Sequence, residues 1–133
     1  MNALRFPLTL CVAAAMTTLI ATGSALADEP KTKVLRHVVM YKFKDGLPAA
    51  QLQQVIDAFA GLPGKIDAII GFEKGTNVSP EGKSEGLTHV FVVTFKDEAG
   101  RDAYLKHPAH DAYVEVVKDK REKVVVFDYW AEE

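Results

Sequence analysis

The side chains best suited to proton chemistry in this sequence are four histidines and one tyrosine. His37 and His89 each begin one face of an alternating apolar run, whereas His107 and His110 lie three residues apart and flank a proline. An imidazole has an ordinary pKa near 6.5, so in a partly dry pocket it exchanges protons around neutral pH. Tyr104 can donate or orient a hydrogen bond through its hydroxyl. These residue types predict a ligand pocket or an acid/base site.

Each of these residues also has an ordinary structural interpretation. A histidine at a helix start often binds a backbone group and fixes the turn, and we favour that role for His107. For His110, a structural role and a place in the pocket are evenly balanced. We expect His37 and His89 to line the pocket without catalysis. Most aromatic residues belong to the core, and Phe91 is expected among the minority that contribute to the pocket wall.

The sequence predicts neither a metal site nor a cofactor. None of the histidines has the four-residue spacing of a helical His-x-x-x-His pair, and a proline interrupts the helix between the last two. The one cysteine, Cys11, lies in the N-terminal apolar run. Glycine-rich phosphate loops, nucleophile elbows and paired-carboxylate signatures do not occur. Any chemistry is therefore expected to depend on side chains alone.

Residues 1–27 have the pattern of a removable secretory signal. Arg5 is the only charge before Asp28, an apolar run follows it, and the triplet 25–27 (ALA) has small residues where a signal peptidase cleaves. A retained anchor is the alternative, since about 20 apolar residues can span a bilayer. Thr, Gly and Ser within the stretch favour removal. We expect a periplasmic or secreted protein that is free of the membrane after cleavage and begins with a polar leader, residues 28–33.

The mature chain is expected to form one small domain. Cleavage after residue 27 leaves 106 of the 133 residues, which is enough for one domain and too few for two. Loss of Arg5 changes the formal net charge from −2 to −3, and acidic and basic residues are interspersed. Without a basic stripe, nucleic-acid binding is not expected. Since Cys11 leaves with the signal, the fold has to depend on packing and on association between chains.

Hydrophobic periodicity predicts four strands and three helices. Apolar residues alternate over two segments and recur at helical spacing after Pro48 until Gly61 ends that helix. Asp97 is placed to cap a short helix. The expected order is strand 34–43, a helix from Pro48, strand 66–75, strand 88–95, a helix through Tyr104, a helix from Pro108, and strand 124–130.

This order predicts an α+β fold of the ferredoxin-like type. The arrangement βαββαβ gives a four-stranded antiparallel sheet with helices on one face. The other face would carry Val38, Met40, Val90 and Val92, which are too apolar to meet water. A homodimer that pairs two such faces would remove these apolar side chains from water, and this is a sufficient physical explanation for their presence.

A set of short motifs is spread over the chain after the leader, and the most specific is Tyr-Leu-x-His-Pro-Ala-His. With these motifs, residues 34–130 resemble the stress-responsive A/B barrel (Dabb) family. The resemblance implies a dimeric α+β barrel in which two sheets face each other across the dimer axis. The motifs are 37–44 (HVVMYKFK), 62–64 (LPG), 72–73 (FE), 86–89 (GLTH), 94–95 (TF), 102–110 (DAYLKHPAH) and 127–129 (FDY).

The resemblance indicates candidate site residues, but it does not indicate a single activity. An enzymatic member of the family, a plant polyketide cyclase, uses a tyrosine and a histidine as acid/base residues. Their motif positions match Tyr104 and His110, and its pocket histidines match His37 and His89. Three hypotheses remain. The favoured one is a protein that binds a small apolar or aromatic molecule in a histidine-edged pocket. The others are an acid/base enzyme that uses Tyr104 and His110 on an enolisable carbonyl compound, and a non-catalytic stress-associated dimer.

Overall fold

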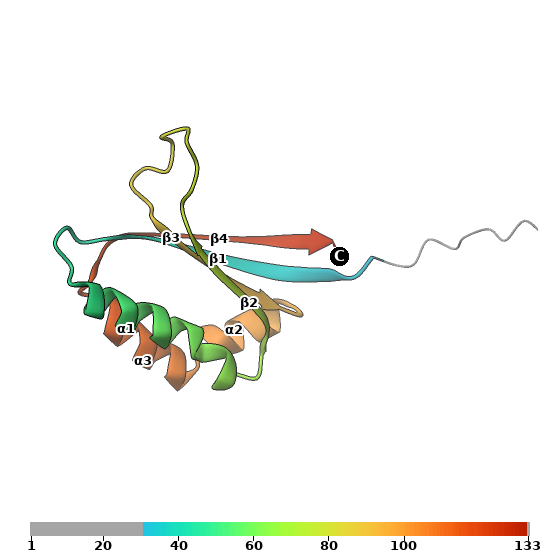
Figure 1. The fold of residues 1–133 in the computed structure, drawn as a ribbon. Coiled ribbons are helices and arrows are strands. Elements are labelled where there is room, and N and C mark those ends of the chain that lie inside the picture. Colours follow the sequence, from blue (N-terminus) through green and yellow to red (C-terminus); the bar gives the residue numbers. More distant parts are fainter. Residues whose placement is uncertain (1–30, 133) are drawn as a thin grey trace, which may run out of the picture.

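A four-stranded antiparallel sheet carries three helices on one of its faces (Figure 1). The computed structural model describes residues 31–132, so the predicted signal peptide and the first half of the polar leader lie outside the described residues. The elements are β1 (Lys33–Phe43), α1 (Ala49–Ala60), a short 3₁₀ helix (Leu62–Gly64), β2 (Ile69–Thr76), β3 (His89–Phe95), α2 (Glu98–Leu105), α3 (Pro108–Val117) and β4 (Arg121–Glu132).

The strands lie in the order β2-β3-β1-β4. β1 is therefore central and pairs antiparallel with β3 on one side and with β4 on the other. β4 forms one edge of the sheet, and Figure 1 shows it running beside β1. The predicted α+β, ferredoxin-like fold is confirmed.

The alternation of β1 determines which side chains face the helices. His37, Val39 and Tyr41 are buried, whereas Val38 and Met40 between them are only half-buried. Because residues opposite each other in an antiparallel pair share a face, the register extends this division to β3 and β4. The face of the sheet that the helices cover is called the inner face below, and the opposite face is called the outer face.

Local sequence signals explain how the three helices begin and end. α1 buries Val55 and Phe59, four residues apart on one face, and it ends at Gly61. α2 starts after Asp97, whose carboxylate accepts a hydrogen bond from the Gly100 N–H at 2.9 Å, as the sequence predicted. α3 has Pro108 at its first position, where a missing N–H is harmless.

Aromatic stacking fixes the helices on the sheet. Phe59 of α1 stacks on Phe91 of β3 with ring centroids 4.3 Å apart, and Tyr113 of α3 lies 4.6 Å from Phe59. Such pairs contribute about 0.5–1.5 kcal/mol beyond the burial of their area. Leu62 and Ile66 complete this core from the segment that follows α1. The core therefore fills the space between α1, α3 and β3.

The second strand starts later than predicted. The sequence placed its start at residue 66, whereas β2 begins at Ile69. The Ile66 N–H donates to the Leu62 carbonyl at 2.9 Å, so the chain still turns at this point. Ile66 is nonetheless buried, and an apolar residue that suggested a strand packs into the core from a turn.

Two further boundaries differ from the prediction. Pro48 precedes α1 as its cap, with an extended ψ of 139°, and does not occupy the first helical position. β4 begins at Arg121, three residues before the predicted start, because pairing with β1 continues past Val124 through a bulge between Lys42 and Phe43.

The outer face of the sheet remains apolar. Val38, Met40, Val90 and Val92 are half-buried, and Phe127 of β4 is 61% exposed beside them. Across residues 31–132, no helix has both the length and the apolar character needed to cross a membrane.

Candidate functional site

A cavity of about 380 Å³ lies between the inner face of the sheet and the helices. It opens toward β4, since Val126 on the inner face of that edge strand is 53% exposed. The lining residues are His37, Val39 and Tyr41 of β1, Phe59 of α1, Arg101, Asp102, Tyr104 and Leu105 of α2, His110, Tyr113 and Val114 of α3, and Arg121, Val124, Val126 and Asp128 of β4.

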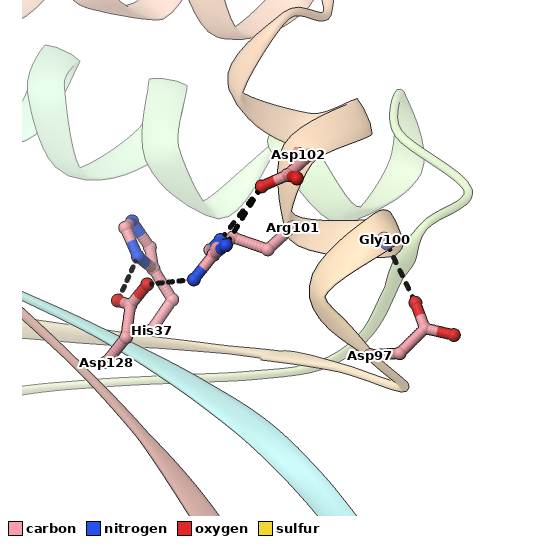
Figure 2. A network of polar contacts seen from close by, with 6 residues as sticks. All are labelled: His37, Asp97, Gly100, Arg101, Asp102 and Asp128. Carbon is pink, nitrogen blue, oxygen red and sulfur yellow. Dashed lines mark hydrogen bonds and ion pairs between the residues drawn. The ribbon is translucent and has the colours of Figure 1, made fainter.

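A carboxylate holds His37 at one end of the cavity. The antiparallel register sets Asp128 opposite His37, and His37 Nδ1 lies 2.7 Å from Asp128 Oδ1. Arg101 Nη1 donates to the second oxygen of Asp128 at 3.1 Å, while its Nε and Nη2 donate to Asp102. Figure 2 shows these contacts, which connect His37 of β1 and Asp128 of β4 with α2. With the carboxylate as acceptor, Nδ1 carries a hydrogen and Nε2 is left for a ligand.

Tyr104 brings the two histidines of the cavity together. Its ring centroid lies 5.6 Å from that of His37 and 4.6 Å from that of His110. The side chain is only 1% exposed, and burial raises the pKa of Tyr104 far above its ordinary value of 10.0. The phenol therefore stays protonated at neutral pH and is available as a hydrogen-bond donor.

The junction between α2 and α3 positions His110 against Tyr104. The Ala109 N–H donates to His107 Nδ1 at 3.0 Å, so His107 caps α3 in the structural role that the sequence favoured. The His107 N–H also donates to the Tyr104 carbonyl at 3.1 Å, which keeps the turn between the helices tight. His110 consequently lies in the first turn of α3 and faces back toward α2.

His110 is held in its neutral form. Its Nδ1 is buried without a hydrogen-bond partner among the described residues. Burial lowers the pKa of His110, with opposing charge effects from Asp111, which raises it, and His37, which lowers it. A charged imidazole would bury an N–H that nothing accepts, at a cost of about 1–3 kcal/mol. Nε2 is the nitrogen that can meet a ligand as a neutral base or donor.

The other end of the cavity has a different chemistry. Tyr113 donates a hydrogen bond to the Tyr41 hydroxyl at 3.0 Å, and Arg121 lies close enough to act on Tyr41. Burial raises the pKa of Tyr41, although the hydrogen bond from Tyr113 and the charge of Arg121 offset part of that effect. Both tyrosines are therefore protonated at neutral pH.

The structure brings three of the predicted site residues together and separates a fourth. His37, Tyr104 and His110 line the cavity, whereas His89 does not. His89 lies at the start of β3, with its ring 5.2 Å from that of Phe43. Burial lowers its pKa there. His89 instead borders two other hollows. One, of about 80 Å³, lies beside Phe91 and Ile56 of α1. The other, of about 660 Å³, lies on the outer face under the loop between β2 and β3, which Figure 1 shows projecting away from the helices.

Phe91 also does not line this cavity. It is 1% exposed beneath Phe59, and its predicted place in the pocket wall is taken by Phe59 itself. The alternation placed Phe91 on the inner face as expected. Alternation alone does not show which inner residues a helix covers completely.

Sequence analysis missed four charged residues of the cavity, Arg101, Asp102, Arg121 and Asp128. Asp128 had a detectable signal, since it falls on the same face as Val124 and Val126 in a predicted strand. A carboxylate on the inner face of a strand requires a partner. No comparable signal identified the two arginines, because their approach to the cavity depends on tertiary packing.

The arrangement favours acid/base chemistry on an uncharged group. A protonated phenol and two imidazoles can bind a carbonyl oxygen and exchange a proton with a neighbouring atom. Within residues 31–132, no group of three or more His, Cys, Asp or Glu side chains is arranged to hold a metal ion.

Comparison with known proteins agrees with the motifs and the geometry. The family model for the stress responsive A/B barrel domain, Dabb, matches residues 35–131, which is most of the chain. The chain belongs to the Dabb family. A stress-response A/B barrel domain-containing protein of Arabidopsis thaliana, HS1, is 33% identical over 102 residues, which cover 77% of this chain and 93% of that protein.

Two enzymes are among the similar proteins. Olivetolic acid cyclase of Cannabis sativa is 33% identical over 95 residues, covering 71% of this chain and 94% of the cyclase. A solved hydroxynitrile lyase from Passiflora edulis superposes with a TM-score of 0.71 at 25% identity, covering 77% of this chain and 96% of the lyase.

Solved Dabb-like neighbours are also described as dimers. A dimeric ferredoxin-like protein of unknown function from Jannaschia superposes with a TM-score of 0.61 at 29% identity, covering 72% of this chain and 97% of that one. These similarities connect the fold with association between two chains.

The lowered pKa of His110 predicts a pH-dependent stability. Since the pKa is depressed in the fold, the unfolded chain binds the proton more readily, and stability falls as the pH drops below the unfolded value of about 6.5. We expect the melting temperature to fall between about pH 7.5 and pH 5.5. His110→Gln should make this fall smaller, whereas Lys106→Gln, outside the cavity, should keep the wild-type fall. Equal falls in all three proteins would contradict the buried neutral state of His110.

Proposed function

We propose that the protein binds a small, mainly apolar carbonyl compound in the cavity and acts on it by acid/base chemistry through Tyr104 and His110. One observation supports this most directly. A buried, protonated phenol meets a neutral imidazole at one end of a cavity with apolar middle walls. A phenol of this kind donates to a carbonyl oxygen, and a neutral imidazole accepts a proton from the adjacent carbon.

The proposed step is proton abstraction next to the carbonyl. The C–H bond breaks, the proton passes to His110, and the electron pair forms an enolate whose oxygen accepts a hydrogen bond from the Tyr104 hydroxyl. His37 lies at the same end, and its hydrogen bond to Asp128 fixes its ring. Its free Nε2 gives the ligand a second polar contact, so His37 orients the carbonyl group.

The similar proteins support an enzymatic use of this fold. The cyclase and the lyase are both named as enzymes, and the family model matches the segment of this chain that contains Tyr104 and His110. Binding without turnover is the simpler function of the same cavity. It requires the ligand contacts but not the proton transfer, and the test below separates the two.

Deuterium exchange into propiophenone tests the proposed chemistry. The wild-type protein should accelerate exchange at the carbon next to the carbonyl, followed by proton NMR in deuterium oxide. His110→Ala and Tyr104→Phe should each lose about tenfold or more of that acceleration, since general acid/base groups contribute on the order of 10²–10⁴-fold.

Lys106→Gln is the matched control and should exchange at the wild-type rate. A wild-type rate in His110→Ala would contradict the proposed base. A rise in melting temperature with propiophenone that disappears in His110→Ala, without any exchange, would establish binding without turnover.

We also propose that two copies pair through the outer face. That face presents Val38, Met40, Val90 and Val92, and the neighbours described as dimers support this use. Val90→Lys would place an unpaired charge in the contact, at a cost of several kcal/mol. Sedimentation should then show monomers or an unfolded chain, whereas Ala103→Lys on exposed α2 should stay dimeric. An unchanged Val90→Lys dimer would show that another face pairs.

Export of the protein is a further proposal, based on the apolar N-terminal run and the ALA triplet at 25–27. Expression of the full chain in a Gram-negative host should yield an exported protein whose first residue is Asp28. N-terminal sequencing of the periplasmic and membrane fractions checks this. An intact N-terminus recovered with the membranes would show a retained anchor instead.

A further inference from the structure

The polar residues at the end of the cavity away from Tyr104 and His110 take no part in the proposed proton transfer. Tyr41 and Tyr113 meet there through their hydroxyls at 3.0 Å, and Arg121 at the start of β4 completes the group. The three side chains come from β1, α3 and β4, so the fold and not a local turn brings them together. Two phenols and a guanidinium are hydrogen-bond donors that suit an anion.

Arg121 has no counter-ion in the part of the chain that the structure describes. None of the ion pairs there joins it to a carboxylate. The neighbouring Glu122 is engaged with Lys42 at 2.8 Å. Arg121 is partly buried and borders the cavity. A guanidinium in a partly enclosed position is costly to leave unpaired, so its preferred partner is an anion inside the cavity.

We propose that the ligand of this protein is an elongated carboxylic acid, and that Arg121, with Tyr41 and Tyr113, binds its carboxylate at the end of the cavity opposite Tyr104 and His110. This inference rests on the proposed function, because it uses the same cavity. It adds the chemical class of the ligand and its direction of binding.

The hydroxyl pair is oriented for this role. Tyr113 donates to the Tyr41 oxygen, which leaves the Tyr41 hydrogen free to donate to a carboxylate oxygen. Both phenols remain protonated because burial raises their pKa values. A carboxylate would thus accept one hydrogen bond from Tyr41 and one or two from the guanidinium of Arg121, whose planar fork matches its two oxygens.

The strand sets an upper limit on the length of the ligand, because Tyr41 is close enough to Tyr104 to affect the pKa of that phenol. His37 and Tyr41 are four residues apart on the inner face of β1, which corresponds to about 13 Å at a rise of about 3.3 Å per residue. Between them, Val39, Val124 and Val126 form apolar walls. The carboxylate and the carbonyl group would therefore lie at the two ends of an apolar chain or ring system.

Decanoate and decanol are a matched pair of probes, equal in chain length and different in the charged end. Isothermal titration calorimetry of the wild-type protein should show decanoate binding at least about tenfold more tightly than decanol, since charge-assisted hydrogen bonds are roughly twice as strong as neutral ones. Arg121→Gln should remove this preference and leave the affinity for decanol unchanged.

Lys123→Gln is the matched control, because it removes one positive charge from the same strand at an exposed position outside the cavity. It should retain the wild-type preference for decanoate. Equal binding of decanoate and decanol to the wild type, or an equal loss in Lys123→Gln and Arg121→Gln, would overturn the carboxylate site. If propiophenone still exchanges its protons through His110 in that case, the proposed function stands without this inference. Failure to bind decanoate, decanol and propiophenone would overturn both.

Discussion

The pairing of β1 with a strand on each side is the constraint on which the other features depend. Its odd-numbered residues from Leu35 to Tyr41 face the helices, and its even-numbered residues face the outer surface. A slip of one residue would exchange the two faces of the strand and turn its core side chains to the outer face. The same register sets His37 opposite Asp128. Core, ligand cavity and apolar outer face are thus fixed together by one alignment of strands.

The cavity exists because the helices cover the inner face of the sheet at β3 but leave it partly exposed at β4. α1 and α3 pack over β3 through Phe59 and Phe91, and the core there is filled. β4 lies at the edge, beyond this aromatic contact, and its inner face at Val126 remains exposed. The space between is polar at both ends, with Asp128 near one and Arg121 near the other. A filled half gives the fold its stability, while the open half leaves room for a ligand.

Sequence patterns predicted most of the fold and about half of the candidate site. Alternation and helix caps identified all four strands and three helices, and the inner face was assigned correctly because period two is a local property. The start of β2 was wrong because Ile66 reaches the core from a turn. His89 was expected in the cavity but borders two separate hollows. Asp128 lies 91 residues from His37, and no local pattern reports contact over such a distance.

Burial connects the chemistry of the cavity with its shape. Desolvation raises the pKa of Tyr104 and lowers the pKa of His110. A hydrogen-bond donor and a proton acceptor are therefore both uncharged at the same end of the cavity. Neither group then needs a counter-ion, which is compatible with apolar walls and with an uncharged reacting group. Arg121 cannot be neutralised in this way, because a guanidinium keeps its charge. The two ends of the cavity therefore select different parts of one ligand: an uncharged carbonyl beside Tyr104 and an anion beside Arg121.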